Sequence, residues 1–155
     1  GTTSHMVIDA TGAVTKPLQP AFLATVGTAI ANFAPNSAVV VAFPSEVFDQ
    51  NLDYNTNGTF TAPVTGKYQI NINIQLQNLD SAANYYQTQL ITSNRAYYYT
   101  VDTDYGQDQT YQNLDISVLA DMDAADTVVV KIYQSAGTQQ TDIDATSSFS
   151  GALIC

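Results

Sequence analysis

The segment from Lys67 to Gln77 alternates apolar and polar side chains without interruption. Its apolar members are Tyr68, Ile70, Ile72, Ile74 and Leu76, and its polar members are Gln69, Asn71, Asn73, Gln75 and Gln77. Because successive side chains of a strand point to opposite faces, this period of two predicts a strand with one buried face. The polar face carries no charge, which fits either contact with another subunit or ordinary exposure to water, and the pattern leaves both open.

Other short segments rich in Val, Ile, Thr, Tyr and Phe are separated by turn residues and are predicted to be strands. They cover residues 21–26, 38–43, 59–62, 86–92, 96–101, 111–119, 127–133 and 148–154. They recur about every 8–12 residues, the interval expected of a sandwich or barrel. No segment beyond a turn or two has helical periodicity, so the sequence predicts an all-β fold.

The length of 155 residues, 45% of them hydrophobic, is enough for one globular domain with its own core. Ten Tyr and six Phe argue against disorder, because such side chains supply the burial that offsets the entropy of ordering. No apolar run approaches the roughly 18 residues of a membrane-spanning helix, and no signal peptide is recognised. Membrane insertion is therefore not expected.

Acidic residues dominate the charged positions, with fourteen Asp and Glu against four Lys and Arg and a net charge of −10. Thirteen of the acids are Asp, which favours turns over helices. The four basic residues, Lys16, Lys67, Arg95 and Lys131, are scattered along the chain. Because neutralising phosphates needs clustered Lys and Arg, nucleic acid is not an expected partner.

Residues needed for catalysis are scarce. Residues 1–6, GTTSHM, look like the remnant of an expression vector and are set aside, and with them goes His5, the only histidine. Cys155 is the only cysteine and ends the sequence. A nucleophile with an oriented base therefore cannot be assembled. No spacing of Asp residues indicates a glycosidase pair, so no enzymatic activity is expected.

A block in the first half of the chain carries a family resemblance. It consists of Phe43, Asp49, Tyr54, the run Phe60-Thr-Ala-Pro-Val-Thr-Gly66, and Tyr68. These residues and spacings resemble the diagnostic block of C1q-like domains, the complement-head relatives of tumour necrosis factor. Phe60 comes one residue early, and Ile70 and Ile72 stand where the family usually has aromatic residues. Residues 20–24, 119–129 and 148–153 resemble other strands of the family, so the likeness covers roughly residues 19–155.

This resemblance implies a ten-stranded jelly-roll sandwich at residues 19–155 that assembles as a homotrimer, preceded by a linker at residues 7–18. A narrower likeness, to bacteriophage tail-fibre and other virion proteins, rests on residues 46–50, 92–95, 117–123 and 151–155. It implies a non-enzymatic module on the virion surface, or otherwise outside the cell, that trimerises and binds a host receptor protein or glycan. The alternatives are a secreted complement-like or lectin-like domain of a cellular organism, and trimerisation alone.

Calcium is the one ligand ion that the composition suggests, because it takes six to eight oxygen ligands. No cofactor is required by the implied function. Asp102, Asp104 and Asp108, with Gln107, stand where some members of the resembling family bind calcium. A second cluster, Asp121, Asp123 and Asp126, lacks the Gly and Glu of a helix-loop-helix calcium loop and is interpreted as solvated turn residues.

Tyrosines are concentrated in the middle of the chain and suggest a recognition surface. Tyr gives a large contact area at low entropic cost. Strand alternation directs part of the run into the core or a trimer contact. The loop tips at residues 85–86 and 102–109 are the expected recognition sites, and the candidate residues are Tyr85, Tyr86, Tyr98 and Tyr105.

Overall fold

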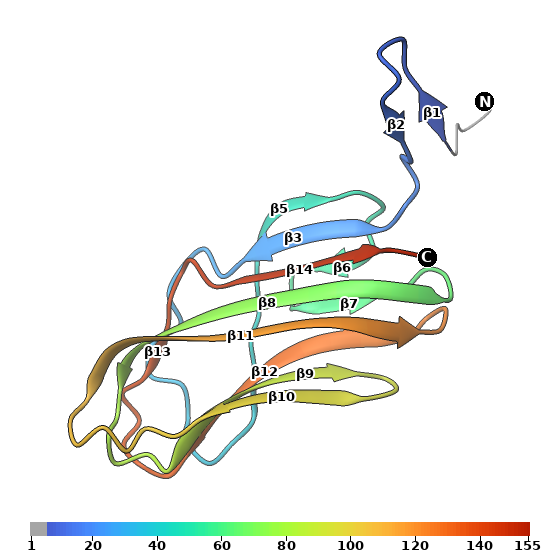
Figure 1. The fold of residues 1–155 in the computed structure, drawn as a ribbon. Helices are drawn as coiled ribbons and strands as arrows, with labels where there is room; N and C mark the ends of the chain where they lie inside the picture. The colour runs from blue at the N-terminus through green and yellow to red at the C-terminus, as the bar shows by residue number, and fades with distance from the viewer. Residues whose placement is uncertain (1–5) are drawn as a thin grey trace.

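The computed structural model describes residues 6–155. Within that range the fold has fourteen strands and no helix. Twelve of the strands form two six-stranded sheets that pack against each other, and the other two form a separate hairpin (Figure 1). The all-β prediction is confirmed.

The first sheet, here called the β9 sheet, has the order β10-β9-β12-β7-β6, with β4 also paired to β12. In that order the strands are Ala96–Val101, Tyr85–Thr92, Thr127–Ser135, Thr59–Thr61 and Tyr54–Asn55, and β4 is Val39–Val40. All of its pairings are antiparallel. The neighbours of β12 come from distant parts of the chain, so the sheet closes only when the whole domain folds.

The second sheet, here called the β8 sheet, has the order β11-β8-β14-β3-β5, with β13 also paired to β8. In that order the strands are Gln109–Met122, Gly66–Leu79, Ser148–Leu153, Ala21–Thr25 and Ser45–Asp49, and β13 is Asp142–Ile143. Five strands lie on the main path of each sheet, which gives the ten strands expected of the jelly roll. The two-residue strands β4 and β13 are additions to that pattern.

Strand β8 confirms the alternation seen in the sequence. Its apolar side chains, Tyr68, Ile70, Ile72, Ile74 and Leu76, are all buried in the core between the sheets. Its polar side chains face outward and pair with those of β11. Ser117 donates to the Asn71 carboxamide oxygen at 2.8 Å, and Asn73 donates to Asp115 at 2.6 Å. No other layer of the described chain covers this outer face, so it is free to meet another subunit.

The other predicted strands all exist, but residues 38–43 shorten to the two residues of β4. The pattern misses strands β5, β6 and β13, and also β1 (Val7–Ile8) and β2 (Val14–Thr15). Strand β5 lies at the edge of its sheet, where four of its five residues are exposed, so it has no alternating pattern. Strands β6 and β13 have two residues each, too few to show a period.

Buried rings fill the core at one end of the sandwich. We call Phe22, Phe43, Tyr54, Phe60 and Phe149 the aromatic cluster. The ring of Phe22 stacks on those of Tyr54 and Phe60, with centroids 4.9 and 4.8 Å apart, and meets Phe149 edge-on. The Tyr54 hydroxyl donates to the Phe43 carbonyl at 2.9 Å. The family-like block therefore supplies Phe43, Tyr54 and Phe60 to this end of the core, and strands β3 and β14 supply Phe22 and Phe149.

Asp49 of that block orders the chain leading to Tyr54. Its carboxylate accepts hydrogen bonds from the backbone N–H of Asp53 at 3.2 Å and from that of Tyr54 at 2.8 Å. Burial, and then the nearby Asp49 carboxylate, raise the pKa of Asp53. The Asp49 carboxylate thus satisfies two backbone donors of the turn that leads to Tyr54.

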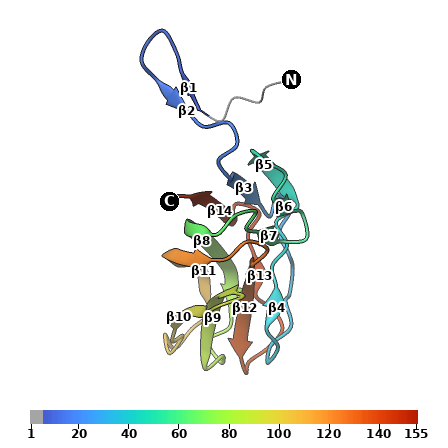
Figure 2. The same ribbon diagram turned by 90° about the vertical axis from the view of Figure 1, so that its right-hand side faces the viewer.

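The hairpin lies in the segment predicted as a linker. Strand β1, Val7–Ile8, pairs with β2, Val14–Thr15, and the two strands form a sheet of their own. Figures 1 and 2 show the hairpin standing clear of the sandwich, at the end where the C-terminus also lies. Residues 6–155 contain no helix that is long and apolar enough to cross a membrane.

Candidate functional site

Three loops lie together at the end of the sandwich opposite the C-terminus (Figure 1). They are residues 80–84 between β8 and β9, residues 102–108 between β10 and β11, and residues 136–141 between β12 and β13. We call them the distal loops. They bring together three parts of the sequence, among them the predicted recognition loop at residues 102–109, whereas the other predicted tip, residues 85–86, begins strand β9.

Asp108 ties the three distal loops to one another. One carboxylate oxygen accepts hydrogen bonds from the N–H and hydroxyl of Ser81, at 2.9 and 2.8 Å. The other accepts from the Gln140 side chain at 3.0 Å. The Ser81 N–H, followed by the Gln140 amide, lowers the pKa of Asp108. Asp108 is thus engaged in holding the loops.

Asp80 forms a second, buried connection in the distal loops. Its carboxylate accepts a hydrogen bond from the Ala82 N–H at 2.8 Å and another from the Thr138 N–H. Gly137 lies directly above it with a φ of +76°, and a Cβ there would stand 2.8 Å from an Asp80 oxygen. Glycine is therefore required both by the left-handed backbone and by the close carboxylate.

The candidate calcium residues do not form one ligand set. Asp102 and Asp104 line a shallow hollow of about 280 Å³ together with residues 81–84, and Asp102 accepts a hydrogen bond from the Asp104 N–H at 3.1 Å. Asp108 turns instead to Ser81 and Gln140. Across residues 6–155 no three His, Cys, Asp or Glu side chains are grouped so that they could hold a metal ion. Asp102 and Asp104 therefore lie beside one hollow, while the Asp108 carboxylate is engaged by two other loops.

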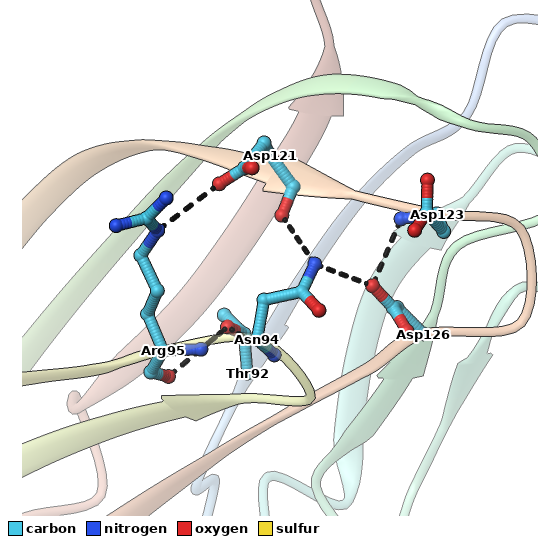
Figure 3. Close-up of polar contacts among 6 residues, drawn as sticks. All are labelled: Thr92, Asn94, Arg95, Asp121, Asp123 and Asp126. Carbon is cyan, nitrogen blue, oxygen red and sulfur yellow. Dashed lines mark hydrogen bonds and ion pairs between the residues drawn. The ribbon is translucent and has the colours of Figure 1, made fainter.

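The second acidic cluster is a turn tied to a neighbouring hairpin (Figure 3). One carboxylate oxygen of Asp126 accepts hydrogen bonds from the Asp123 N–H and the Asn94 amide, both at 2.8 Å. The Arg95 guanidinium meets the Asp121 carboxylate at 3.3 Å, and both side chains are largely exposed. Hydrogen bonding within Asp121 itself, then the Arg95 contact, lower the pKa of Asp121. The geometry favours the interpretation as turn residues.

Tyr86 is a core residue, so its assignment to a recognition surface is wrong. It is 0% exposed, and its hydroxyl oxygen accepts the Asp80 N–H at 3.0 Å and contacts the Thr141 hydroxyl at 2.6 Å. Burial is the main reason that the pKa of Tyr86 is raised. Strand alternation decides this outcome, because Tyr85 and Tyr86 must point to opposite faces of β9.

The remaining candidate tyrosines reach the surface to different degrees. Tyr105 in the distal loops is 45% exposed, and Tyr98 on the edge strand β10 is 58% exposed. Tyr85 is half-buried, with its ring 5.8 Å from that of Tyr133. Only Tyr105 stands among the distal loops, while Tyr98 lies on the side of the sandwich.

The sequence did not point to Ser81 or Asn84, which line the hollow with Asp102 and Asp104. Their small polar side chains look like any turn, and only the pairing of distant strands places them beside the aspartates. The family-like block does not include Ser81 or Asn84. His5 lies outside the described residues, and Cys155 is exposed at the end of the chain.

Comparison with known proteins identifies the fold. A family model described as the C1q domain matches residues 21–154. The globular domain of zebrafish complement 1qA protein is 16% identical, with a TM-score of 0.64 over 88% of this chain and 98% of that chain. Murine APRIL is 8% identical, with a TM-score of 0.63 over 88% of this chain and 99% of that chain. No curated protein sequence matches the chain.

Proposed function

Since the chain belongs to the C1q domain family, we propose that it is a non-enzymatic, homotrimeric module of a bacteriophage tail fibre or virion surface. In this proposal it binds a host receptor protein or glycan. The observation that carries the proposal is the position of the distal loops, which present Tyr105 and an acidic hollow at the end away from the hairpin. A site at that end stays accessible when the other end is attached to a larger particle.

Two different exposed surfaces support the trimer. The outer face of the β8 sheet has a hollow of about 260 Å³ lined by small and apolar residues such as Ala21, Phe48 and Ala152 and by the amides Gln69 and Asn71. The edge strand β10 exposes Tyr98 and Tyr99. Contact between two unlike surfaces of identical chains closes into a ring when the rotation allows it. Covering β10 also removes an open strand edge with no charged residue, which would otherwise invite aggregation.

Recognition through the distal loops needs no strong single site. Three copies of a weak site on one particle raise the effective affinity without any new contact. The acidic hollow favours a partner that donates hydrogen bonds or carries positive charge, and residues 80–84, 102–108 and 136–141 themselves contain no Lys or Arg. Tyr105 adds an aromatic surface beside them.

The alternative is a secreted complement-like or lectin-like domain of a cellular organism. It is favoured by the likeness in fold to the zebrafish complement 1qA globular domain. The two proposals share the trimer and the distal loops, and they differ in the surface that is bound. Binding to bacterial cells supports the virion module, and binding only to animal or plant glycoproteins supports the alternative.

The decisive experiment measures binding of the labelled protein to panels of candidate bacterial hosts. We expect Tyr105→Ala to reduce binding to a recognised host while leaving the thermal unfolding midpoint unchanged. Leu52→Ala is the matched control, because Leu52 is 86% exposed and lies outside the distal loops. No binding to any natural host, or equal binding by both variants, would contradict recognition through the distal loops.

The proposal requires no cofactor. Because the three carboxylates of residues 102–108 do not converge, we expect removal of calcium with a chelator to leave both assembly and binding unchanged. Light scattering and the same cell-binding assay measure the two properties. Loss of binding on chelation, with recovery on adding calcium, would contradict this part of the proposal.

A further inference from the structure

The hairpin formed by β1 and β2 exposes apolar side chains that no other part of the described chain covers. Ile8 and Val14 are register partners, so they lie on the same face, and they are 64% and 56% exposed. A two-stranded hairpin is at best marginally stable in water unless it packs against something else. The Ile8–Val14 face therefore lacks the cover that such a hairpin needs.

The hairpin is well formed at its turn. The Asp9 carboxylate accepts hydrogen bonds from the N–H of Thr11 at 2.8 Å and from that of Ala13 at 3.0 Å, and the Thr11 hydroxyl donates to it as well. The Thr11 hydroxyl, followed by these backbone donors, lowers the pKa of Asp9. The turn thus brings β1 and β2 into register and presents Ile8 beside Val14.

The chain between the hairpin and the sandwich is held in place. The Gln50 side chain donates to the Lys16 carbonyl at 2.8 Å, and the Asn51 side chain donates to the Leu18 carbonyl at 2.7 Å. The hairpin is therefore directed away from the sandwich by specific bonds (Figure 2). It does not fold back onto the two sheets, so no part of the chain that the structure describes covers its apolar face.

Charge favours a second copy of this chain as the cover. Residues 7–18 contain one acid, Asp9, and one base, Lys16, so this segment is neutral while the whole chain carries −10. Two copies of so acidic a chain repel each other over most of their surfaces. The electrostatic repulsion is smallest where two neutral surfaces meet. A neutral apolar hairpin is such a surface.

The position of the hairpin adds a second argument. A hollow of about 410 Å³ at its base is lined by Val14, Ala21 and Ala152 among others. Ala21 and Ala152 also line the hollow on the outer face of the β8 sheet, which the proposed trimer uses. The hairpin thus continues that surface, and a trimer formed there gathers three hairpins at one end.

We propose that the hairpins of neighbouring copies pack their Ile8–Val14 faces against one another and form a second, smaller apolar core beyond the sandwich. This inference rests on the trimer proposed above. Assembly raises the effective concentration of the three hairpins, so a contact too weak to form between free chains forms within the trimer. Residues 7–18 then act as an assembly segment.

Cross-linking tests the contact in the full chain. Val14→Cys is made in a Cys155→Ser background and treated with a bismaleimide about 10 Å long, the spacing of apolar strand layers packed face to face. Tyr105→Cys in the same background is the control, because Tyr105 is 45% exposed and lies in the distal loops, at the end of the sandwich away from the hairpin. We expect Val14→Cys to give about tenfold more covalent dimer than the control, as its effective concentration is set by the trimer.

Light scattering of the same samples separates the two proposals. A trimeric mass with no excess cross-linking at Val14 overturns the hairpin contact and leaves the trimer standing. A monomeric mass overturns both. A mixture of the Val14→Cys and Ile154→Cys variants can instead form cross-links between the two variants and not between two Val14→Cys chains. That result places the hairpin in the neighbour's hollow and also overturns the proposed contact.

A second measurement does not depend on a new cysteine. In the assembled protein, we expect the Asp9 N–H, which donates to the Ala13 carbonyl at 3.0 Å, to exchange slowly with deuterium. Ile8→Ser speeds this exchange about tenfold while the mass stays trimeric, because a marginal hairpin loses its cover. Equal exchange in both proteins overturns the inference.

Discussion

The aromatic cluster and the distal loops lie at opposite ends of the same sandwich and are stabilised in different ways. In the aromatic cluster, Phe22 has three ring neighbours with centroids within 5 Å, and ring volume decides the packing. In the distal loops, Asp80 and Asp108 hold the backbone through hydrogen bonds, and much of the surface is exposed. Packing tolerates few substitutions, whereas exposed loop positions between such ties can vary. The proposed recognition surface thus lies at the end where variation leaves the fold intact.

The largest expected effect comes from removing a ring of the aromatic cluster. Phe149→Ala should lower the free energy of unfolding by about 3–5 kcal/mol, because Phe149 is fully buried against Phe22 and Phe43 and leaves a cavity. Denaturant unfolding measures the loss. Tyr98→Ala, on the exposed edge strand, should change the same quantity by less than about 0.5 kcal/mol. Similar losses in both variants would remove the contrast between the packed and the exposed parts.

Overpacking the same cluster should cost less than emptying it. Gly151 lies so close to Phe22 and Ile70 that a Cβ would stand 2.7 and 2.8 Å from their ring and side-chain carbons. Gly151→Ala should therefore lower the free energy of unfolding by about 1–3 kcal/mol. Gly106→Ala in the distal loops is an informative comparison, since a Cβ there meets nothing and only its φ of +71° opposes alanine. A larger loss for Gly106→Ala would show that loop strain outweighs core packing.

The Tyr54 hydroxyl should have an intermediate effect with a defined pH dependence. Tyr54→Phe leaves the buried Phe43 carbonyl without its donor, which should cost about 1–2 kcal/mol at neutral pH. Burial raises the pKa of Tyr54 from 10.0 to about 12. The native state thus favours the protonated phenol, so wild-type stability is full below pH 10 and declines between pH 10 and about 12. The decline should be shallower in Tyr54→Phe, and identical pH profiles would contradict the assignment.

The smallest of the four effects is expected at Asp108 in the distal loops. Hydrogen bonds lower the pKa of Asp108 below 3.8, so its carboxylate stabilises the fold above that pH and loses this effect as the pH falls further. Asp108→Asn should lower the thermal unfolding midpoint slightly at neutral pH, and the difference should vanish in acid. Asp104→Asn is the control, since no other loop contacts its carboxylate among the described hydrogen bonds. A difference that grows in acid would contradict the role of Asp108.

The sequence predicted the strands best where one face is buried along its length. Strand β8 was recognised from five alternating apolar residues, and β12 from its run of Val and Ile. The edge strand β5 was not predicted, because neither of its faces is buried and its exposed Val47 and Phe48 give no periodic pattern. The strands of the hairpin were not predicted for the same reason, since their apolar residues lie on the surface of the single chain.

The candidate site was predicted only in part. The loop at residues 102–108 was correctly placed on the surface, but the partners of Asp108, which are Ser81 and Gln140, come from two other loops. Spacing along the chain could not show that Asp108 turns away from Asp102 and Asp104. Tyr86 was misplaced because the sequence of two adjacent tyrosines does not say which of them faces the core.

The sequence by itself determined the all-β class and the inward face of β8, because burial imposes a local period of two. Tertiary structure alone decided which carboxylates hold loops, which tyrosines reach the surface and that the hairpin stands clear of the sandwich. The first two depend largely on segments brought together across more than twelve residues of chain, as most contacts in this fold are, and the third depends on the bonds from Gln50 and Asn51 to the chain after β2. The packing of the two sheets against each other decides such positions, and a local sequence pattern carries no information about it.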